Sequence, residues 1–195
     1  MKKIILGSNS PRRRELLAGL DLDFTVDTGN TFEESIIPGT PPAQVPVLMS
    51  EGKSRGFHRP LGPDELLITA DTVVIVGSRV LGKPHSREEA IGMLESLSGK
   101  VHEVVTAVTL RDCNRSETVT ASTRVTFCDL TAAEIERYVD KYRPYDKAGA
   151  YGIQEWIGYV GISGIEGSFY NVMGFPVHKV YKALQEFVGE VIYEK

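Results

Sequence analysis

The sequence predicts an α/β fold, and three observations support this class. Short aliphatic runs alternate along the chain with segments of helical periodicity, an order typical of sheets covered by helices. Of the 195 residues, 42% are hydrophobic and 25% charged, which is ordinary globular composition. A chain of this length typically buries roughly 70% of its unfolded surface. We therefore expect one large domain, or two lobes sharing a core, that needs no disulfide or structural metal.

The first third of the chain predicts a strand, a capped helix and a second strand. Residues 3–7 are aliphatic and end at a glycine, so we expect a buried strand there. Ser10 can cap a helix in which Pro11 takes the first position. The next expected elements are a strand at 23–27, a Gly-, Pro- and Thr-rich loop at 28–42, and a helix from there to about Gly56.

The middle of the chain predicts strands and a further helix. Residues 66–70 and 73–76 are strand-like, with Asp71-Thr72 breaking the apolar run. Ser86 and Glu89 form a capping box for a helix that continues to Leu97. Alternating β-branched residues then predict paired strands at 101–111 and 117–127, with a turn near Asn114.

The last third predicts two helices and a glycine-rich connection. Thr131 and Glu134 form a second capping box. The glycine-punctuated segment 153–172 predicts short strands, and Pro176 begins a last helix that runs to about Phe187.

Net charge and cysteine content exclude several classes of protein. With 22 basic and 26 acidic residues the net charge is −4, which argues against a nucleic-acid coat or a basic membrane anchor. Cys113 and Cys128 lack CxxC spacing and fit small buried thiols in a reducing compartment. The aliphatic run at 4–6 is too short for a signal peptide or a membrane span. We expect a cytoplasmic protein that binds neither nucleic acid nor membranes.

Charge is nevertheless unevenly distributed along the chain. Residues 1–14 hold five bases and no acid, whereas residues 15–52 hold seven acids and no base. These blocks are either a solvated surface or a phosphate-binding wall beside a cation-binding wall.

Common nucleotide and metal motifs are absent from the sequence. No GxGxxG follows the first predicted strand, so a dinucleotide fold is not indicated. Residues 77–84 approach a Walker A loop, but Pro84 stands where a hydroxyl should bind Mg²⁺. The four histidines show no paired metal spacing, which argues against a zinc hydrolase.

The segment 8–14, Ser-Asn-Ser-Pro-Arg-Arg-Arg, is the strongest candidate for phosphate binding. Hydroxyls, free amides at a helix N-terminus and guanidinium groups gather within seven residues, and each favours an anion. Ser8, Arg12 and Arg13 are the expected ligands. The alternative is an ordinary N-cap followed by surface arginines.

Asp71 is the second candidate, because an acid at the end of a buried run is costly unless it has a partner. It either caps a turn, or binds a metal or activates a water. Lys83 lies at a rigid Gly-Lys-Pro turn and can reach a phosphate. Lys53, Lys147 and Glu34 are weaker candidates for the site, because a residue of each type is more often an ordinary surface residue.

Six motifs in order resemble the Maf family of nucleoside triphosphate pyrophosphatases. They are Ser8-x-Ser10-Pro11-Arg12-Arg13, Ala70-Asp71-Thr72, Gly82-Lys83-Pro84, Leu97-Ser98-Gly99, Asp146 to Gln154, and Gly174-Phe175-Pro176. The resemblance implies one domain over 1–195 with the two-lobed fold of the inosine triphosphate pyrophosphatases, a mixed twisted sheet and a central cleft. It also implies hydrolysis between the α and β phosphates with a divalent cation, Mg²⁺ or Mn²⁺, and Asp71 at the catalytic acceptor position.

The same resemblance links Arg12, Thr72 and Gln154 to substrate choice. Ala70-Asp71-Thr72 and Ile153-Gln154 resemble the dTTP/UTP branch, whereas the 7-methyl-GTP branch tends to show Asp-Gln and Ser-Glu-Gly there. Glu155-Trp156 depart from the family pattern, in which a glycine frequently follows the glutamine.

The resulting hypothesis assigns a role to each candidate. Ser8, Arg12, Arg13 and Lys83 hold the triphosphate, with Lys53 and Lys147 as further substrate ligands. Glu34 and Asp71 bind the cation, Asp71 or a metal-bound water supplies the nucleophile, and Thr72 and Gln154 read the pyrimidine. The competing hypotheses are a 7-methyl-GTP pyrophosphatase and a non-catalytic nucleotide-binding regulator of cell division. Long exposed sheet edges are also compatible with a homodimer.

Overall fold

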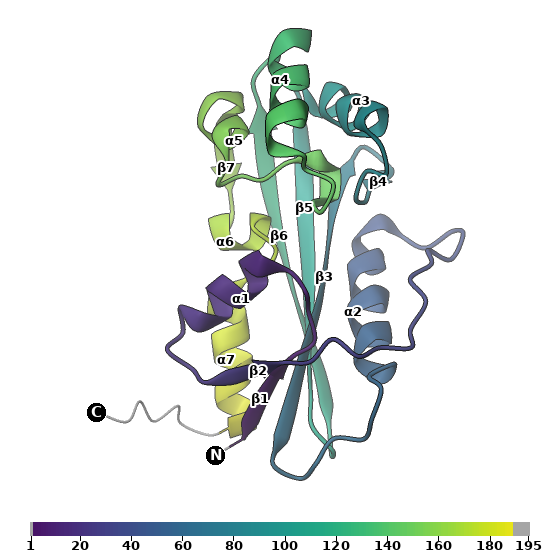
Figure 1. Ribbon diagram of the computed structural model, residues 1–195, viewed down its shortest axis with the longest axis vertical. Coiled ribbons are helices and arrows are strands. Elements are labelled where there is room, and N and C mark those ends of the chain that lie inside the picture. The colour runs from purple at the N-terminus through teal and green to yellow at the C-terminus, as the bar shows by residue number, and fades with distance from the viewer. Residues whose placement is uncertain (1, 189–195) are drawn as a thin grey trace. The chain divides into compact units, whose positions relative to one another are not determined.

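The computed structural model describes residues 2–188 and contains a mixed set of helices and strands (Figure 1). The strands are β1 (Lys3–Leu6), β2 (Phe24–Val26), β3 (Glu65–Val76), β4 (Arg79–Leu81), β5 (Val101–Arg111), β6 (Ser116–Phe127) and β7 (Ile162–Glu166). The helices are α1 (Pro11–Ala18), α2 (Val45–Arg55), α3 (Arg87–Leu97), α4 (Ala132–Tyr142), α5 (Trp156–Gly161), α6 (Phe169–Val172) and α7 (Val177–Val188). Two 3-10 turns are η1 (Pro42–Gln44) and η2 (Ala148–Ala150).

The described strands form a seven-stranded mixed sheet in the order β2-β1-β3-β5-β6-β7, with β4 paired to β3. β1 is parallel to both of its neighbours, and Ile5 lies opposite Thr25 on β2 and Leu67 on β3. β4 pairs with β3 and β7 pairs with β6 in antiparallel fashion. This arrangement confirms the predicted α/β class and the mixed sheet.

The chain divides into two compact units. Among the described residues, unit 1 comprises 2–71, 106–121 and 174–188, and unit 2 comprises 72–105 and 122–173. The long strands β3, β5 and β6 each contribute residues to both units. The single domain over 1–195 with a shared cleft stays a prediction.

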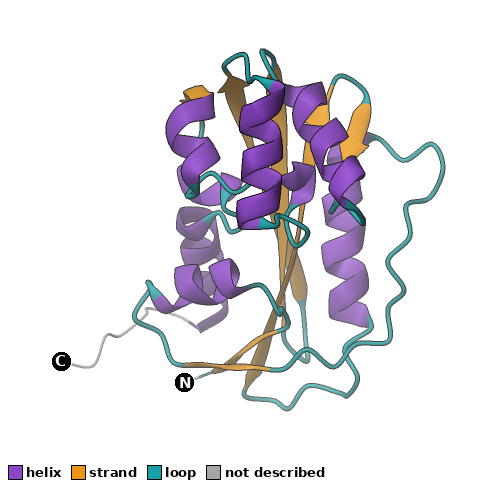
Figure 2. Cartoon of the chain, turned by 45° about the horizontal axis from the view of Figure 1, so that its top comes forward, coloured by secondary structure: helices purple, strands orange, loops and turns teal. Residues whose placement is uncertain are grey.

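Unit 1 is organised around the parallel strands β1 and β3. Ile5, Leu67 and Phe57 form a buried cluster, and α1 buries Leu16 and Leu17 against the unit's core. Ser10 caps α1 as predicted, since its hydroxyl accepts from the Arg13 backbone at 3.5 Å and Pro11 takes the first helical position. The loop that leads from β2 to η1 is drawn as a long irregular segment in Figure 2.

In unit 2 the helices α3 and α4 pack side by side (Figure 1). Thr131 and Glu134 form the predicted capping box at the start of α4. A buried aromatic cluster in the same unit joins His102 on β5, Phe127 on β6 and Tyr151, with ring centroids 4.9 to 5.4 Å apart. His102 Nε2 lies 2.7 Å from the Tyr151 hydroxyl.

Three local expectations are corrected. The strand-like segments 66–70 and 73–76 are one continuous strand, because β3 runs from Glu65 through Asp71-Thr72 to Val76 and its backbone pairing does not depend on side-chain polarity. The segment 153–172 holds two short helices and one strand rather than several strands. Cys113 and Cys128 are free thiols as expected, but both are exposed rather than buried.

No helix among residues 2–188 combines the length and apolar character that a membrane crossing requires.

The buried histidine of unit 2 predicts an acid-sensitive fold. Burial lowers the pKa of His102 to about 4 from 6.5. Between these two pH values the imidazole is protonated in the unfolded chain and neutral in the folded chain. The free energy of unfolding should therefore fall as the pH drops from about 6.5 towards 4, by up to about 3 kcal/mol from this group.

Urea unfolding of wild type and His102→Gln, near neutral pH and near pH 5, measures this effect. His178→Gln, at an exposed position on α7, is the matched control. An identical pH dependence in wild type and His102→Gln would contradict the assignment.

Candidate functional site

The segment before α1 gathers Ser8 and Arg13 in unit 1. Ser8 is buried, and its hydroxyl accepts from the backbone N–H of Ser10 at 3.3 Å and from Arg13 Nη1 at 3.4 Å. Arg13 also donates from Nη1 to the Ala70 carbonyl at 2.8 Å and from Nε to the Gly174 carbonyl at 3.0 Å. One guanidinium thus joins three segments that are distant in sequence.

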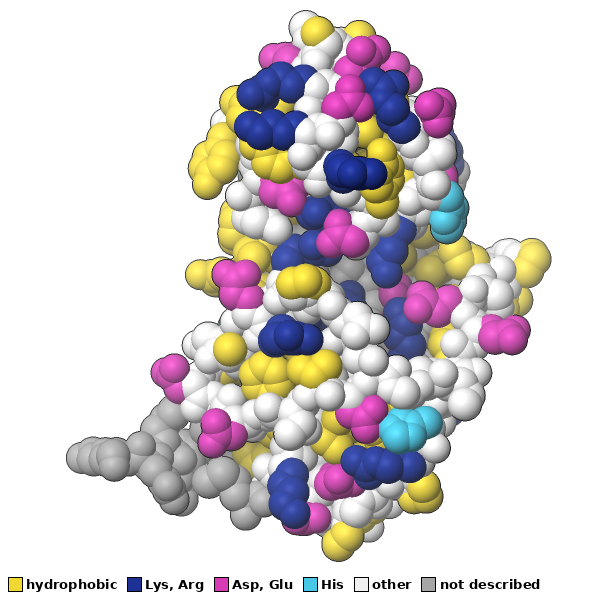
Figure 3. Space-filling model, viewed as in Figure 1, with side chains coloured by type: hydrophobic (Ala, Val, Ile, Leu, Met, Phe, Trp, Pro, Cys, Tyr) yellow, Lys and Arg dark blue, Asp and Glu magenta, His cyan; other side chains and the backbone are white. Residues whose placement is uncertain are grey.

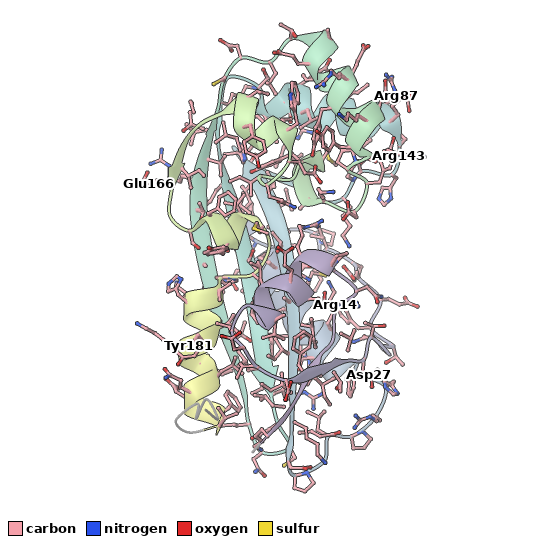
Figure 4. All side chains as sticks on the ribbon, turned by 60° about the vertical axis from the view of Figure 1, so that its left-hand side comes forward. Arg14, Asp27, Arg87, Arg143, Glu166 and Tyr181 are labelled. Carbon is pink, nitrogen blue, oxygen red and sulfur yellow. The ribbon has the colours of Figure 1, made fainter. Side chains whose placement is uncertain are left out.

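Arg13 is therefore not the surface arginine that the N-cap alternative assumed. The residue keeps some exposed area, yet desolvation by the surrounding protein lowers the pKa of its guanidinium, and the nearby charge of Asp71 opposes this shift. Arg12 is half-buried, whereas Arg14 is exposed on α1 (Figure 4). The predicted cap and the predicted anion site share this turn.

The second group of charges in unit 1 is a triad centred on Lys53. Its ammonium, supplied by α2, lies 2.7 Å from Asp71 Oδ1 on β3 and 3.2 Å from Glu34 Oε1 on the loop before η1. The side chains of Lys53 and Asp71 are each 16% exposed, while that of Glu34 is 55% exposed. The structure thus brings together three residues that were weak or ambiguous candidates separately.

The two carboxylates that pair with Lys53, those of Glu34 and Asp71, are also the residues expected to bind a divalent cation. Among residues 2–188, no group of three or more His, Cys, Asp or Glu side chains is arranged to hold a metal ion. Mg²⁺, however, is usually held by one or two carboxylates together with substrate phosphates. Glu34 and Asp71 therefore fit a divalent cation whose other ligands come from the phosphates of the substrate.

Unit 2 contains a separate network around Lys147. The Lys147 ammonium lies 2.8 Å from Asp146 Oδ1 and 3.0 Å from Glu155 Oε1, and its side chain is 9% exposed. The Tyr138 hydroxyl on α4 donates to Glu155 Oε2 and accepts from the Gly152 backbone N–H. Burial, assisted by the Glu155 carboxylate, raises the pKa of Tyr138, so this phenol stays a donor at neutral pH.

The backbone between Lys147 and Gly152 is tightly wound. Gly149 and Ala150 both adopt left-handed conformations, with φ of 66° and 60°. A Cβ on Gly149 would lie 2.8 Å from Val74, so only glycine fits there. For Ala150 this conformation costs roughly 1–2 kcal/mol, and such strain concentrates at functional sites. The hydrogen bonds of Tyr138 to Glu155 and to the Gly152 backbone stabilise the loop that contains Ala150.

The remaining sequence candidates also lie in unit 2. Gln154 follows the wound loop, and its Oε1 is shielded from solvent without a hydrogen-bond partner among the described residues. Thr72 is half-buried on β3. Lys83 is exposed after β4, and the neighbouring Gly82 carbonyl accepts from the Gly149 N–H at 2.9 Å. This last bond joins two motifs that were recognised separately.

Comparison with known proteins shows which family these motifs mark. The family model described as "Maf-like protein" matches residues 3–187. The chain belongs to the Maf family. Its curated relatives include proteins named "dTTP/UTP pyrophosphatase" from Parabacteroides distasonis and Bacteroides thetaiotaomicron. The first is 48% identical over 95% of this chain and 96% of the relative, and the second is 50% identical over 94% and 95%.

A solved structure, "Structure of a HAM1 protein from Coxiella burnetii", also resembles the chain. It has 15% sequence identity and a TM-score of 0.49, and the match covers 95% of this chain and 100% of that one. The expected relation to the fold of the inosine triphosphate pyrophosphatases stays a prediction.

Two residues of the Lys147 network were not predicted from the sequence as candidate site residues. Glu155 was noted only as a departure from the family pattern, although a carboxylate so near Lys147 in sequence was a usable signal. Tyr138 gave no signal, because it lies on the buried face of the strongly amphipathic helix α4, where an aromatic residue is expected.

The two lysines nearest the N-terminus serve the fold rather than the Arg13 cluster. Lys2 pairs with Asp112 at 2.8 Å, and Lys3 pairs with Asp64 at 3.0 Å. Of the five bases at 1–14, the two lysines thus pair with acids away from α1, and only the three arginines lie on α1.

The contacts of Arg13 predict that its removal lowers the stability of the fold, which is not expected for an arginine that contacts only phosphate. In Arg13→Ala, the Ala70 and Gly174 carbonyls lose charged donors, at roughly 1–3 kcal/mol each. The free energy of unfolding should therefore fall by about 2–6 kcal/mol, as measured by urea unfolding.

Arg14→Ala, one position away on the exposed side of α1, is the control and should change stability little. A raised KM in Arg13→Ala with wild-type stability would show instead that Arg13 acts on phosphate alone.

Proposed function

We propose that this Maf protein is a nucleoside triphosphate pyrophosphatase that hydrolyses dTTP and UTP to the monophosphate and pyrophosphate. The observation that carries the proposal is the Asp71–Lys53–Glu34 triad, in a chain about half identical to proteins named dTTP/UTP pyrophosphatase. A carboxylate fixed by an ammonium group, in the same unit as an arginine-bearing helix N-terminus, suits reaction of a polyanionic substrate.

Phosphate binding is assigned to the start of α1. The helix N-terminus and the guanidinium of Arg12 attract the triphosphate, while Arg13 and Ser8 fix the turn that presents them. Lys83 and Lys147 of unit 2 remain proposed phosphate ligands on the strength of the motifs that carry them.

Asp71 is assigned the role of general base. Lys53 donates to Oδ1, which orients the carboxylate and leaves its second oxygen to accept a proton. Water that loses this proton attacks the α-phosphorus, the α–β anhydride bond breaks, and pyrophosphate leaves with the bonding electron pair. Charge on the phosphate oxygens rises in the transition state, so fixed cations such as Lys53 stabilise it.

A divalent cation, Mg²⁺ or Mn²⁺, belongs to the same proposal. Glu34 and Asp71 would hold it, and when bound it would neutralise charge on the phosphate oxygens. Lys53 pairs with both of these carboxylates, which limits their mutual repulsion.

Thr72 and Gln154 are assigned to the base. Gln154 can accept from N3–H of thymine or uracil through Oε1 and donate from its amide nitrogen to a ring carbonyl. A cytoplasmic location, a homodimer and the absence of nucleic-acid and membrane partners stay predictions.

A substrate panel tests the function directly. Pyrophosphate release is measured with Mg²⁺ from dTTP, UTP, CTP and 7-methyl-GTP, and dTTP and UTP should give the highest kcat/KM. Asp71→Asn should lower kcat at least ~100-fold while nucleotide binding persists, because the amide cannot accept the proton.

Asp64→Asn is the matched control, since Asp64 is an exposed acid that pairs with Lys3. Absence of turnover in wild type, with binding intact, would favour the non-catalytic regulator. Near-normal turnover in Asp71→Asn would remove this residue from the mechanism.

Base recognition gives a second prediction. Cytosine has no N3–H, so wild type should disfavour CTP by roughly 5- to 150-fold, the equivalent of one unpaired buried polar group at about 1–3 kcal/mol. Gln154→Glu loses the amide donor and should weaken dTTP and UTP hydrolysis more than 7-methyl-GTP hydrolysis.

Relative kcat/KM values for the four substrates measure the effect. Gln185→Glu, on the exposed face of α7, makes the same chemical change away from the base and is the control. Equal scaling of all four rates by Gln154→Glu would exclude base recognition by this residue.

A further inference from the structure

The loop that carries Glu34 lies against α2 in unit 1, and its ion pair alone does not explain this placement. Glu34 is 55% exposed and reaches Lys53 Nζ at 3.2 Å. Acidic and hydrophobic side chains come to the surface along this loop (Figure 3), and Ile37, farther along it, is 64% exposed. An exposed carboxylate on a loop gains little stability from one ion pair. Other contacts must therefore hold Glu34 beside the helix.

Phe32, two residues before Glu34, packs on α2 in a notch left by two glycines. A Cβ added to Gly52 would lie 2.3 Å from Cζ of the phenylalanine ring, and one added to Gly56 would lie 2.7 Å from the Phe32 Cβ. Real Cβ atoms essentially never come this close, so a side chain at either glycine would displace Phe32. The two glycines are four residues apart, so they lie on one face of the helix, and the aromatic side chain runs along that face.

Hydrogen bonds hold the backbone beside Phe32 against the end of α2. The Thr31 N–H donates to the Gly56 carbonyl at 2.8 Å. The Asn30 side chain accepts from the Phe32 N–H at 2.7 Å and donates to the Lys53 carbonyl at 2.5 Å. The helix that supplies the ammonium group therefore also positions the loop that supplies its carboxylate partner.

Glycine is an unfavourable residue inside α2, and the notch explains its presence. Glycine in the middle of a helix is less stable than alanine, because it loses more backbone freedom on folding. Gly92 in α3 makes the contrast: it is exposed, and a Cβ added there would meet no atom of the described residues within 4 Å. Gly52 is buried, and the ring of Phe32 occupies the space of its missing side chain.

We propose that Phe32, packed in the notch of α2, is a positioning residue that holds Glu34 beside Lys53. Glu34 is one of the two proposed ligands of the divalent cation, so release of the loop from α2 weakens cation binding. Phe32 acts through this carboxylate and has no contact with the substrate. The inference rests on the proposed function and adds the residue that sets the position of Glu34.

Two variants empty or fill the notch. Phe32→Ala removes the ring, and Gly52→Ala places a methyl group where the ring lies, although alanine favours the helix itself. Each has a matched control: Ile37→Ala shortens an exposed apolar side chain of the same loop, and Gly92→Ala adds a methyl group in open space on α3. Phe32→Leu keeps an apolar side chain in the notch and should restore most of the wild-type behaviour.

Two measurements on the full chain need no turnover. Amide hydrogen exchange of segment 30–34 should be at least ~10-fold faster in both notch variants, because the Thr31 N–H is bonded to Gly56 only while the loop lies on α2. The dissociation constant for Mn²⁺, followed by the EPR signal of the free ion, should rise by roughly 10- to 100-fold, the range typical for groups that orient a metal ligand. Both controls should keep the wild-type values.

Hydrolysis assays distinguish positioning from a general structural role. In Phe32→Ala the Mg²⁺ concentration for half-maximal dTTP hydrolysis should rise by a factor similar to that of the Mn²⁺ dissociation constant. KM for dTTP at saturating Mg²⁺ should stay near the wild-type value. Addition of Phe32→Ala to Glu34→Gln should cause no further loss, since the carboxylate that the ring positions is already absent.

The outcomes separate this inference from the proposed function. Wild type that takes up no Mn²⁺, or notch variants with wild-type exchange or wild-type Mn²⁺ affinity, overturn the inference even where dTTP is hydrolysed. A further loss in the double variant also overturns it and assigns Phe32 to the stability of the fold. Notch-dependent Mn²⁺ binding without dTTP turnover in wild type supports the inference and refutes the proposed hydrolysis. Circular dichroism and thermal unfolding check each variant, and Gly52→Ala decides if Phe32→Ala does not fold.

Discussion

The guanidinium of Arg13 is the interaction on which the arrangement of unit 1 depends. It donates to the end of the buried run of β3 through Ala70, to the segment before α7 through Gly174, and to Ser8 within its own turn. These contacts fix α1 relative to β3 at the residue just before Asp71. The same side chain therefore fixes both the turn before α1 and the position of β3 next to Asp71.

The two largely buried lysines of the candidate site each lie between two carboxylates. Lys53 lies between Asp71 and Glu34, and Lys147 lies between Asp146 and Glu155. Unpaired charges at these levels of burial would be costly, so pairing lets the fold keep ionised groups where a polyanion is expected. The Tyr138 hydroxyl links the second cluster to the Gly152 backbone, two residues after Ala150 with its left-handed conformation.

Local signals explain why much of this could be predicted from sequence. Ser10 and Pro11 define the start of α1 by short-range chemistry, and Asp71 drew attention as an acid at the end of an apolar run. Arg13 could not be placed, because two of its acceptors are backbone carbonyls, which leave no mark in the sequence. The triad was equally hidden, since Glu34, Lys53 and Asp71 are ordinary charged residues until the loop, α2 and β3 bring them together. The glycines of 153–172 predict breaks between short strands, whereas in the structure Gly158 permits a close contact between α5 and the preceding loop.

The discontinuous make-up of unit 1 has a consequence for biosynthesis. Arg13 and its acceptor Gly174 are separated by 161 residues, so the ribosome adds the acceptor on the order of 10–30 s after the donor. Throughout that interval the nascent chain lacks one of the three anchors of this guanidinium. The residues that follow Gly174, including α7, are also missing. Native closure of unit 1 therefore waits until Gly174 has been synthesised, and a chaperone that shields the early segments would act during this interval.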